Sequence, residues 1–314
     1  MAAWRGRWSE PTGRNGVACV PGAGIAWAAR SRRTLTVVAL TWLVCGAASM
    51  DPARAGSSHS GQGYRFGVFP YLPALTIDRV FGPMAGSFAA TLERPVYLKT
   101  KPTFEQFVIG IRRETYDIIF VHPFLYVDAA DQHGYLPLAR LEGRLSAVVL
   151  AGSDRPWSGW ADLSGKTLAA PAPLSAVSEL VRAALLDARL TPGIDTTLQH
   201  YRTKISCLQA VLVGAADACA LPKFALPQIG AIGNGKLRVI AETASTKHLL
   251  FAAHPRIPED QRAKLRSLIV SWPLTAEGKA IMAIGSWPRF VPAQDADYEE
   301  VRNFDARSEA LAQQ

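Results

Sequence analysis

Ser175 stands where a loop enters a segment with the apolar pattern of a helix, and this position suits the binding of an anion. The amides in the first turn of a helix lack intrahelical partners, and the helix dipole favours negative charge there. The alternative interpretation is that Ser175 only caps its helix, with Ser178 and Glu179 completing the first turn. Both interpretations place a hydroxyl at a helix start.

Two cations, Arg202 and Lys204, follow the strand-like segment 197–201 and precede another helical segment. Lysine presents a mobile point charge and arginine a planar fork, and both suit an anionic ligand. The alternative is that one or both are solvated surface charges. Tyr201 and His200 alternate across the strand end, so at most one of them faces a ligand, and we expect this to be Tyr201.

Tyrosine and histidine side chains also follow strands in the first half of the chain. Tyr71 comes shortly after the first strand, His122 ends the third strand, and Tyr126 lies one turn into the next helix. Ligands of parallel α/β sheets bind beyond the carboxyl ends of the strands, where these residues fall. The alternatives are helix packing for Tyr126 and a turn histidine bonded to the backbone for His122.

Two of the four cysteines, Cys207 and Cys219, lie outside the first 55 residues, which are described below as an export signal. Cys207 falls in the first turn of a helix and Cys219 late in the next strand, and rises of ~1.5 Å and ~3.3 Å per residue bring them to similar heights. A disulfide is therefore allowed, with buried thiols or a reactive thiolate as alternatives. No CxxC motif or Cys/His cluster is present, so we expect no metal site and no cofactor.

Alternating strands and helices must position these side chains. The βαβαβ order predicts mainly parallel sheets with helices on both faces. We expect strands at 64–69, 96–98, 117–121, 146–150, 167–170, 197–201, 216–221, 237–241 and 249–253. We expect helices at 75–92 with a break near Gly82-Pro83, and at 103–113, 175–190, 205–213, 258–272, 275–284 and 295–304.

Composition excludes disorder and argues against a nucleic-acid partner. The chain has 314 residues, of which 49% are hydrophobic, enough for two domain-sized cores or one large core. Its net charge is +8, but the first 55 residues hold seven of the 34 basic and two of the 26 acidic residues. The remaining 27 basic and 24 acidic residues give only +3, so we expect no nucleic-acid binding.

The first 55 residues have the pattern of an export signal. Arg30, Arg32 and Arg33 precede an apolar run over 35–50, and a small-x-small cleavage site follows at 53–55. We predict cleavage before Gly56 by either the general or the twin-arginine route. A retained membrane anchor is the alternative, but Cys45-Gly46 interrupts the apolar run.

Four segments, in order along about residues 64–304, resemble the phosphate/phosphite/phosphonate-binding family of type II periplasmic solute-binding proteins that serve ABC importers. They are Asp162–Ala169 with Pro173-Leu174-Ser175, Tyr116–Phe120 with Tyr126, Ala210–Ala218, and Thr275–Ala280 with Asp297-Tyr298. The resemblance implies an α/β, two-lobed periplasmic binding protein type II fold in which each lobe is a mixed, mainly parallel sheet flanked by helices.

The resemblance also implies the organisation and the partners. Residues 64–143 plus 250–314 would form lobe 1 and residues 144–249 an inserted lobe 2, with hinge crossings near 143–150 and 242–250. A small oxyanion would bind between the lobes of a periplasmic, monomeric, non-enzymatic protein that delivers it to an ABC permease in the inner membrane. The ligand-binding residues we predict are Tyr71, His122, Tyr126, Ser175, Tyr201 and Lys204.

The sequence departs from the family at the expected site. Phosphonate binders of the family carry Ser-Thr-Ser where this chain has Ser175-Ala176-Val177, and a histidine where it has Lys204. Ligand identity is therefore not carried over. Two other functions remain open: an enzyme on the binding fold with Cys207, His122 or Lys204 as reactive groups, and a sensing partner of a membrane kinase.

Overall fold

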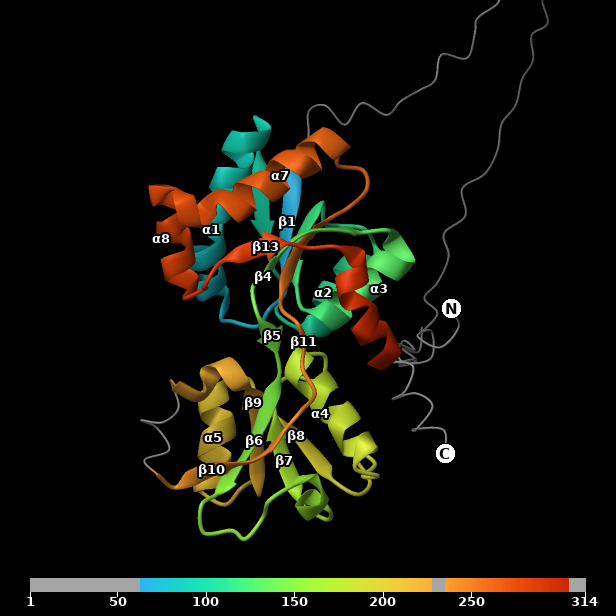
Figure 1. Ribbon diagram of the computed structural model, residues 1–314, viewed down its shortest axis with the longest axis vertical. Coiled ribbons are helices and arrows are strands. Elements are labelled where there is room, and N and C mark those ends of the chain that lie inside the picture. The colour runs from blue at the N-terminus through green and yellow to red at the C-terminus, as the bar shows by residue number, and fades with distance from the viewer. Residues whose placement is uncertain (1–62, 228–234, 305–314) are drawn as a thin grey trace, which may run out of the picture. The chain divides into compact units, whose positions relative to one another are not determined.

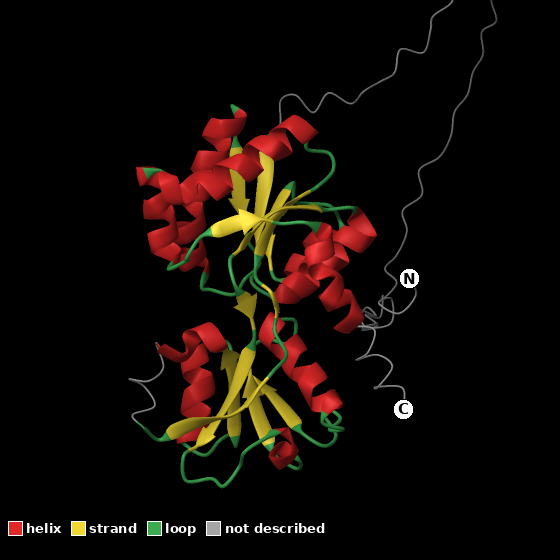
Figure 2. Cartoon of the chain, in the orientation of Figure 1, coloured by secondary structure: helices red, strands yellow, loops and turns green. Residues whose placement is uncertain are grey.

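The computed structural model describes residues 63–227 and 235–304, which form two separate β-sheets with flanking helices (Figures 1 and 2). The first sheet has the strand order β13-β4-β12-β3-β1-β2, and the second has the order β10-β6-β9-β7-β8. Each sheet with its helices is called a lobe below. The predicted signal over residues 1–55 and its cleavage point before Gly56 lie outside the described residues.

The first sheet is built from both ends of the described chain. Strand β1 pairs in parallel with β2 and β3, whereas β12 pairs antiparallel with β3 and β4, and β13 pairs antiparallel with β4. The strands are β1 (Tyr64–Val68), β2 (Val96–Lys99), β3 (Ile118–Val121), β4 (Leu136–Leu141), β12 (Leu250–Ala253) and β13 (Phe290–Pro292).

Helices flank the first sheet on two sides (Figure 1). Helix α1 contacts both α7 and α8, and α2 contacts α3. Their bounds are α1 (Ala74–Leu92), α2 (Phe104–Arg112), α3 (Pro123–His133), α7 (Glu259–Ser271) and α8 (Ala276–Gly285), with 3-10 turns η4 (Trp272–Leu274) and η5 (Asp295–Tyr298). A last helical segment follows η5 over residues 299–304.

The second sheet forms from the middle of the chain. Strands β8 and β9 each pair in parallel with β7, while β6 pairs antiparallel with β9 and β10. Helices α4 and α5 flank this sheet on opposite sides (Figure 1). The elements are β6 (Ala147–Gly152), η2 (Trp160–Leu163), β7 (Thr167–Ala170), α4 (Ala176–Asp187), β8 (Thr197–His200), α5 (Lys204–Leu212), β9 (Ala218–Pro222), η3 (Lys223–Ala225) and β10 (Leu237–Glu242).

The two segments that run between the sheets pair with each other. Strand β5 (Arg144–Leu145) lies antiparallel to β11 (Thr246–Lys247), with Leu145 opposite Thr246. Both strands fall within the hinge crossings predicted from the sequence. The connection between the sheets is thus a short hydrogen-bonded ribbon (Figure 1).

Three local expectations were wrong. Helix α1 continues through Pro83 without the predicted break. A proline inside a helix costs about 3 kcal/mol, but α1 buries an apolar face that includes Phe81, Met84 and Phe88, and this burial offsets the cost. The predicted excess of parallel pairing is also absent: the described strands of the first sheet form two parallel and three antiparallel pairs.

The third difference is that β4 and β13 were not predicted. Pro137 lies inside β4, and proline removes a donor from the ladder, so its sequence argued against a strand. The structure accommodates Pro137 opposite Ala252, where the register between β12 and β4 shifts. Strand β13 has only three residues and ends at Pro292 on the sheet edge.

Candidate ligand-binding site

Tyr71 lies just beyond the carboxyl end of β1, on the first lobe. Its ring stacks on Phe69 with the centroids 4.5 Å apart, and its amide donates to the Phe69 carbonyl. Burial raises the pKa of Tyr71 above its ordinary value, so the hydroxyl stays protonated. That hydroxyl has no hydrogen-bond partner among the described residues, which leaves a neutral donor for a ligand.

His122 lies at the carboxyl end of β3 but is only 1% exposed. It caps α3, because its Nδ1 accepts a hydrogen bond from the Leu125 amide, and its Nε2 lies 2.9 Å from the carbonyl oxygen of Leu174 in the second lobe. The contacts correspond to the alternative of a turn histidine bonded to backbone. Both ring nitrogens are therefore used within the protein.

Tyr126 is fully buried in the first lobe, where its side chain contacts the 3-10 turn η5. Its hydroxyl donates to Asp295 Oδ1 at 2.6 Å, and its ring centroid lies 4.7 Å from that of Tyr298. Burial, reinforced by the bond to Asp295, raises the pKa of Tyr126. The structure thus does not bring Tyr126 together with the other predicted site residues.

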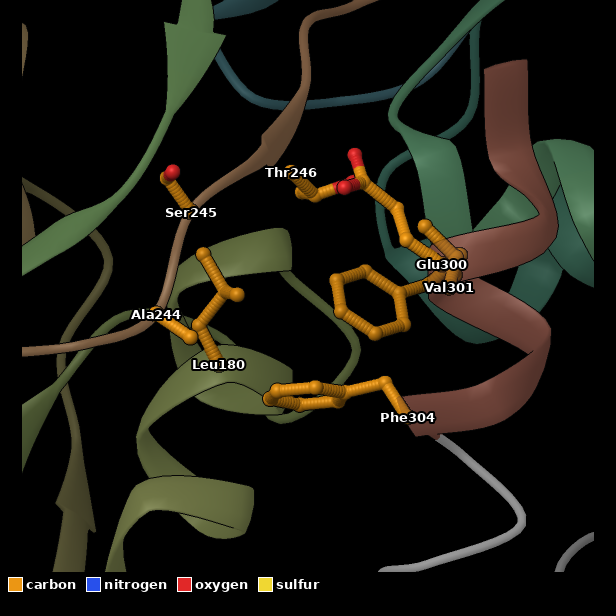
Figure 3. A pocket seen from close by; sticks show the side chains of 8 residues that line it. Leu180, Ala244, Ser245, Thr246, Glu300, Val301 and Phe304 are labelled. Atoms are coloured by element: carbon orange, nitrogen blue, oxygen red, sulfur yellow. The ribbon is translucent and has the colours of Figure 1, made fainter.

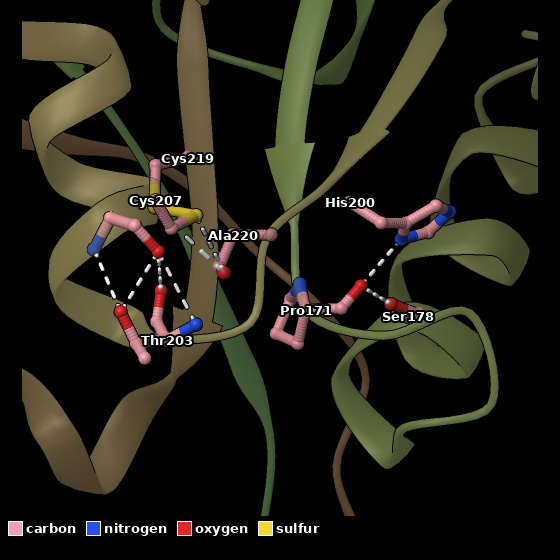
Figure 4. The surroundings of a disulfide bond; sticks show 8 residues. Pro171, Ser178, His200, Thr203, Cys207, Cys219 and Ala220 are labelled. Carbon is pink, nitrogen blue, oxygen red and sulfur yellow. Dashed lines mark hydrogen bonds between the residues drawn. A yellow bond between two sulfur atoms is a disulfide. The ribbon is translucent and has the colours of Figure 1, made fainter. Parts of the chain in front are cut away.

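Ser175 is the N-cap of α4, and its Oγ accepts a hydrogen bond from the Ser178 amide. The Ser178 hydroxyl in turn donates to the Pro171 carbonyl, a bond drawn in Figure 4. The amides of Ala176 and Val177 have no partner among the described residues, as expected for the first turn of a helix. The start of α4 therefore offers backbone N–H groups more than side-chain hydroxyls.

Lys204 opens α5, whose N-cap Thr203 forms a capping box with Ser206. Its Nζ lies 5.9 Å from the centroid of the Phe224 ring, and that ring is 52% exposed. Lys204 is exposed as a residue, while partial burial lowers the pKa of its ammonium. The result is a cation beside an accessible aromatic face at the carboxyl edge of the second sheet.

His200 and Tyr201, which precede Lys204, have different surroundings, as the alternation of side chains along a strand predicts. His200 Nδ1 bonds to the Pro171 carbonyl (Figure 4), so it ties β8 to the loop that leads into α4. Tyr201 is half-buried against the small core beneath α5, and Arg202 is exposed. Asp217 orients the backbone of this sheet: its Oδ2 accepts a hydrogen bond from the Thr167 amide and so fixes the start of β7.

Cys207 and Cys219 form a disulfide with their Cα atoms 5.8 Å apart (Figure 4). Cys207 lies in the first turn of α5 and Cys219 in β9, and both are buried. The bond ties the start of α5, and with it Lys204, to the sheet. A reactive thiolate at Cys207 does not exist in this oxidised form.

One cavity of about 150 Å³ lies away from these residues (Figure 3). Its lining residues come from α3, α4, the second crossing and the last helical segment: Phe124, Leu180, Ala244, Ser245, Thr246, Glu300, Val301 and Phe304. Glu300 accepts hydrogen bonds from Arg144 and from the Lys247 amide. Apolar walls and a carboxylate do not suit an oxyanion, so this cavity is not the candidate site.

The described part of the chain contains no group of three or more His, Cys, Asp or Glu side chains placed to hold a metal ion. Among the same residues, no helix has both the length and the apolar content needed to cross a bilayer.

A family model described as "ABC transporter, phosphonate, periplasmic substrate-binding protein" matches residues 66–298. The chain belongs to this family of phosphonate-binding periplasmic proteins. The resemblance inferred from sequence motifs and the mixed α/β type II fold are therefore confirmed. Members of the family are substrate-binding components of ABC transporters, and this assignment replaces the enzyme alternative.

Solved structures share the fold at low sequence identity. A binding protein component of an ABC phosphonate transporter from Pseudomonas aeruginosa has a TM-score of 0.68 at 15% identity, over 80% of this chain and 88% of that one. PhnD1 from Prochlorococcus marinus, in complex with methylphosphonate, has a TM-score of 0.68 at 16% identity, over 78% and 97%. A Xanthomonas citri protein bound to ATP has a TM-score of 0.67 at 14% identity, over 79% and 97%. No curated protein sequence matches this chain.

Proposed function

We propose that this periplasmic binding protein takes up a small organic oxyanion, of the phosphonate type, between its two lobes and delivers it to an ABC permease. The observation that carries the proposal is the set of donors at the carboxyl ends of the strands: the Tyr71 hydroxyl, the first-turn amides of α4 and the Lys204 ammonium. Together they can replace the water shell of an anion without any covalent step.

Apolar groups beside these donors favour an oxyanion with a carbon substituent over inorganic phosphate. The half-exposed ring of Phe224 lies beside Lys204, whereas the side chains of Ala176 and Val177 at the start of α4 are buried and offer no hydroxyl. Fewer hydroxyls are then offered to the oxygens, and the Phe224 ring offers apolar surface to the substituent. PhnD1, of the same fold, was solved with methylphosphonate, which supports this class of ligand.

The lobes we propose are residues 64–143 plus 250–314 and residues 144–249, which close by bending at 143–150 and 242–250. The pairing of β5 with β11 supports this proposal, because both predicted crossings pass through one short ribbon. Export by a cleaved signal over residues 1–55 and function as a monomer belong to the same proposal.

The test is a thermal-shift screen of the purified protein, followed by calorimetry, with methylphosphonate, ethylphosphonate, phosphate, phosphite, methanesulfonate and acetate. A ligand that binds only the folded state raises the melting temperature. We expect the alkylphosphonates to give the largest shifts. A larger shift with inorganic phosphate would contradict the organic class, and no shift with any of these anions would contradict the function.

A further inference from the structure

The hydrogen bond from His122 to Leu174 joins the two lobes. His122 directly follows β3 of the first lobe, and Leu174 directly precedes Ser175, the N-cap of α4 in the second lobe. Its Nε2 lies 2.9 Å from the Leu174 oxygen.

The surroundings of His122 fix its protonation. A carbonyl can only accept, so Nε2 carries the hydrogen, while Nδ1 accepts from the Leu125 amide. Burial lowers the pKa of the imidazole to about 3, so the ring is neutral. The rings of Phe69, Phe104 and Phe124 surround it, with centroids 5.5 to 6.4 Å away.

We propose that His122 is an interlobe latch, a positioning residue whose Nε2–H holds the start of α4 against the first lobe. A cap for α3 needs a single acceptor, which the short side chain of serine or asparagine supplies. The imidazole adds a second, opposite nitrogen that reaches Leu174. The Phe69 ring contacts both His122 and Tyr71. The latch therefore fixes the position of the Tyr71 ring relative to the first-turn amides of α4. Only the purpose of the latch rests on the proposed function.

Two substitutions separate the latch from the cap. In His122→Asn the amide oxygen takes the place of Nδ1 and still caps α3, but the side chain is too short to reach Leu174. In His122→Gln the terminal amide takes the place of Nε2 and still donates to Leu174, but the cap is lost. If His122 only caps α3, asparagine should replace it with the smaller effect. If His122 is a latch, glutamine should replace it with the smaller effect.

The distance between the lobes is measured without ligand, by pulsed electron resonance between spin labels on unnatural amino acids at Glu105 in α2 and Gln209 in α5, both exposed. We expect a longer and broader distance distribution in His122→Asn and a wild-type distribution in His122→Gln. Broadening in His122→Gln as large as in His122→Asn, or no change in either, would overturn the latch.

Methylphosphonate titration is the second measurement. Loss of one hydrogen bond that preorganises the site should weaken binding about fivefold to tenfold in His122→Asn, with little change in His122→Gln. Equal losses in both variants would again overturn the latch. If methylphosphonate binds to none of the proteins, the proposed ligand fails, while the distance measurement still decides whether the lobes are latched.

Discussion

The two lobes share a mixed α/β plan but are stabilised in different ways. In the first lobe, aromatic rings of β1, β3, α1, β12, β13 and η4 contact one another. The ring of Phe120, for example, contacts five others: Phe69, Phe81, Phe251, Trp287 and Phe290. Beneath α5 in the second lobe, the described core consists of alanine, valine and leucine side chains around the disulfide. Large rings support one wall of the proposed site, and a covalent bond supports the other.

Close packing around glycines is also a feature of the aromatic lobe. The Tyr116 ring lies between Gly67 of β1 and Gly110 of α2, where an added Cβ would come within 2.6 Å and 2.5 Å of Tyr116 atoms. Glycine is required at both positions because any side chain would displace the ring. The first lobe is thus tightly fitted around its aromatic residues.

The largest effect is expected from breaking the aromatic core. Phe120→Ala removes a fully buried ring and leaves a cavity, so the free energy of unfolding should fall by about 3–5 kcal/mol. Urea denaturation followed by circular dichroism measures this change. The exposed Ile109→Ala is the control, with little effect expected. A loss below 1 kcal/mol for Phe120→Ala would show that the rings can repack.

Removing the disulfide tests the other lobe. Cys207 and Cys219 are 12 residues apart, and a loop of this size contributes about 2–4 kcal/mol by restricting the unfolded chain. The double variant Cys207→Ala/Cys219→Ala should therefore unfold at a lower urea concentration than the wild type. The wild type unfolded in reductant should approach the same midpoint, and an unchanged midpoint in the double variant would contradict this role.

The charge of the second lobe is tested by Lys204→Ala. Hydrogen bonds to charged groups contribute about 1.5–3 kcal/mol, so affinity for the anion found in the screen should fall at least about tenfold. Lys223→Ala is the matched control, because Lys223 is an exposed lysine next to Phe224 in sequence and its ammonium binds Glu242. Calorimetry should show a loss for Lys204→Ala only, and equal affinities would remove Lys204 from the site.

The last prediction concerns pH and the buried His122 of the first lobe. The pKa of His122 is lowered to about 3 in the folded state, against an ordinary value of 6.5. Between these values the unfolded chain binds the extra proton, so the free energy of unfolding falls as pH decreases, by about 1.4 kcal/mol per pH unit for this group. His248, whose pKa is lowered to about 4, adds a second contribution in the same direction.

His122→Asn should remove one of these two contributions. Unfolding measured at pH 6.5, 5.5 and 4.5 should show a shallower pH dependence in the variant, smaller by about one proton. The remaining slope then belongs to His248 and other groups. Parallel curves for the two proteins would mean that His122 takes up its proton without unfolding.

Local patterns were sufficient to predict most elements and the family. The apolar run of residues 117–121 became β3, and Ser175 became an N-cap, because a buried strand and a capped helix start depend on neighbouring residues. The reversal of strand direction in β12 and β13 depends on segments that return from the far end of the chain. No local pattern indicated it.

The candidate site could be predicted only as a set of positions. The structure has Tyr71, His122 and Lys204 beyond strand ends, as the sequence predicted, but the sequence did not predict the contacts that these side chains make. Tyr126 bonds to Asp295, 169 residues away, and His122 to Leu174, 52 residues away. Such pairs arise from tertiary packing, so their side chains could not be assigned to a ligand or to the protein from spacing alone.

The pairing of β5 with β11 has a consequence for how long a solute is held. A two-stranded ribbon bends across its face more readily than within its plane, because in-plane bending must stretch one strand against the other. In the closure proposed above, this ribbon would restrict motion of the lobes to essentially one direction. A permease that twists this ribbon, with no contact to the solute itself, would have direct mechanical control over unloading.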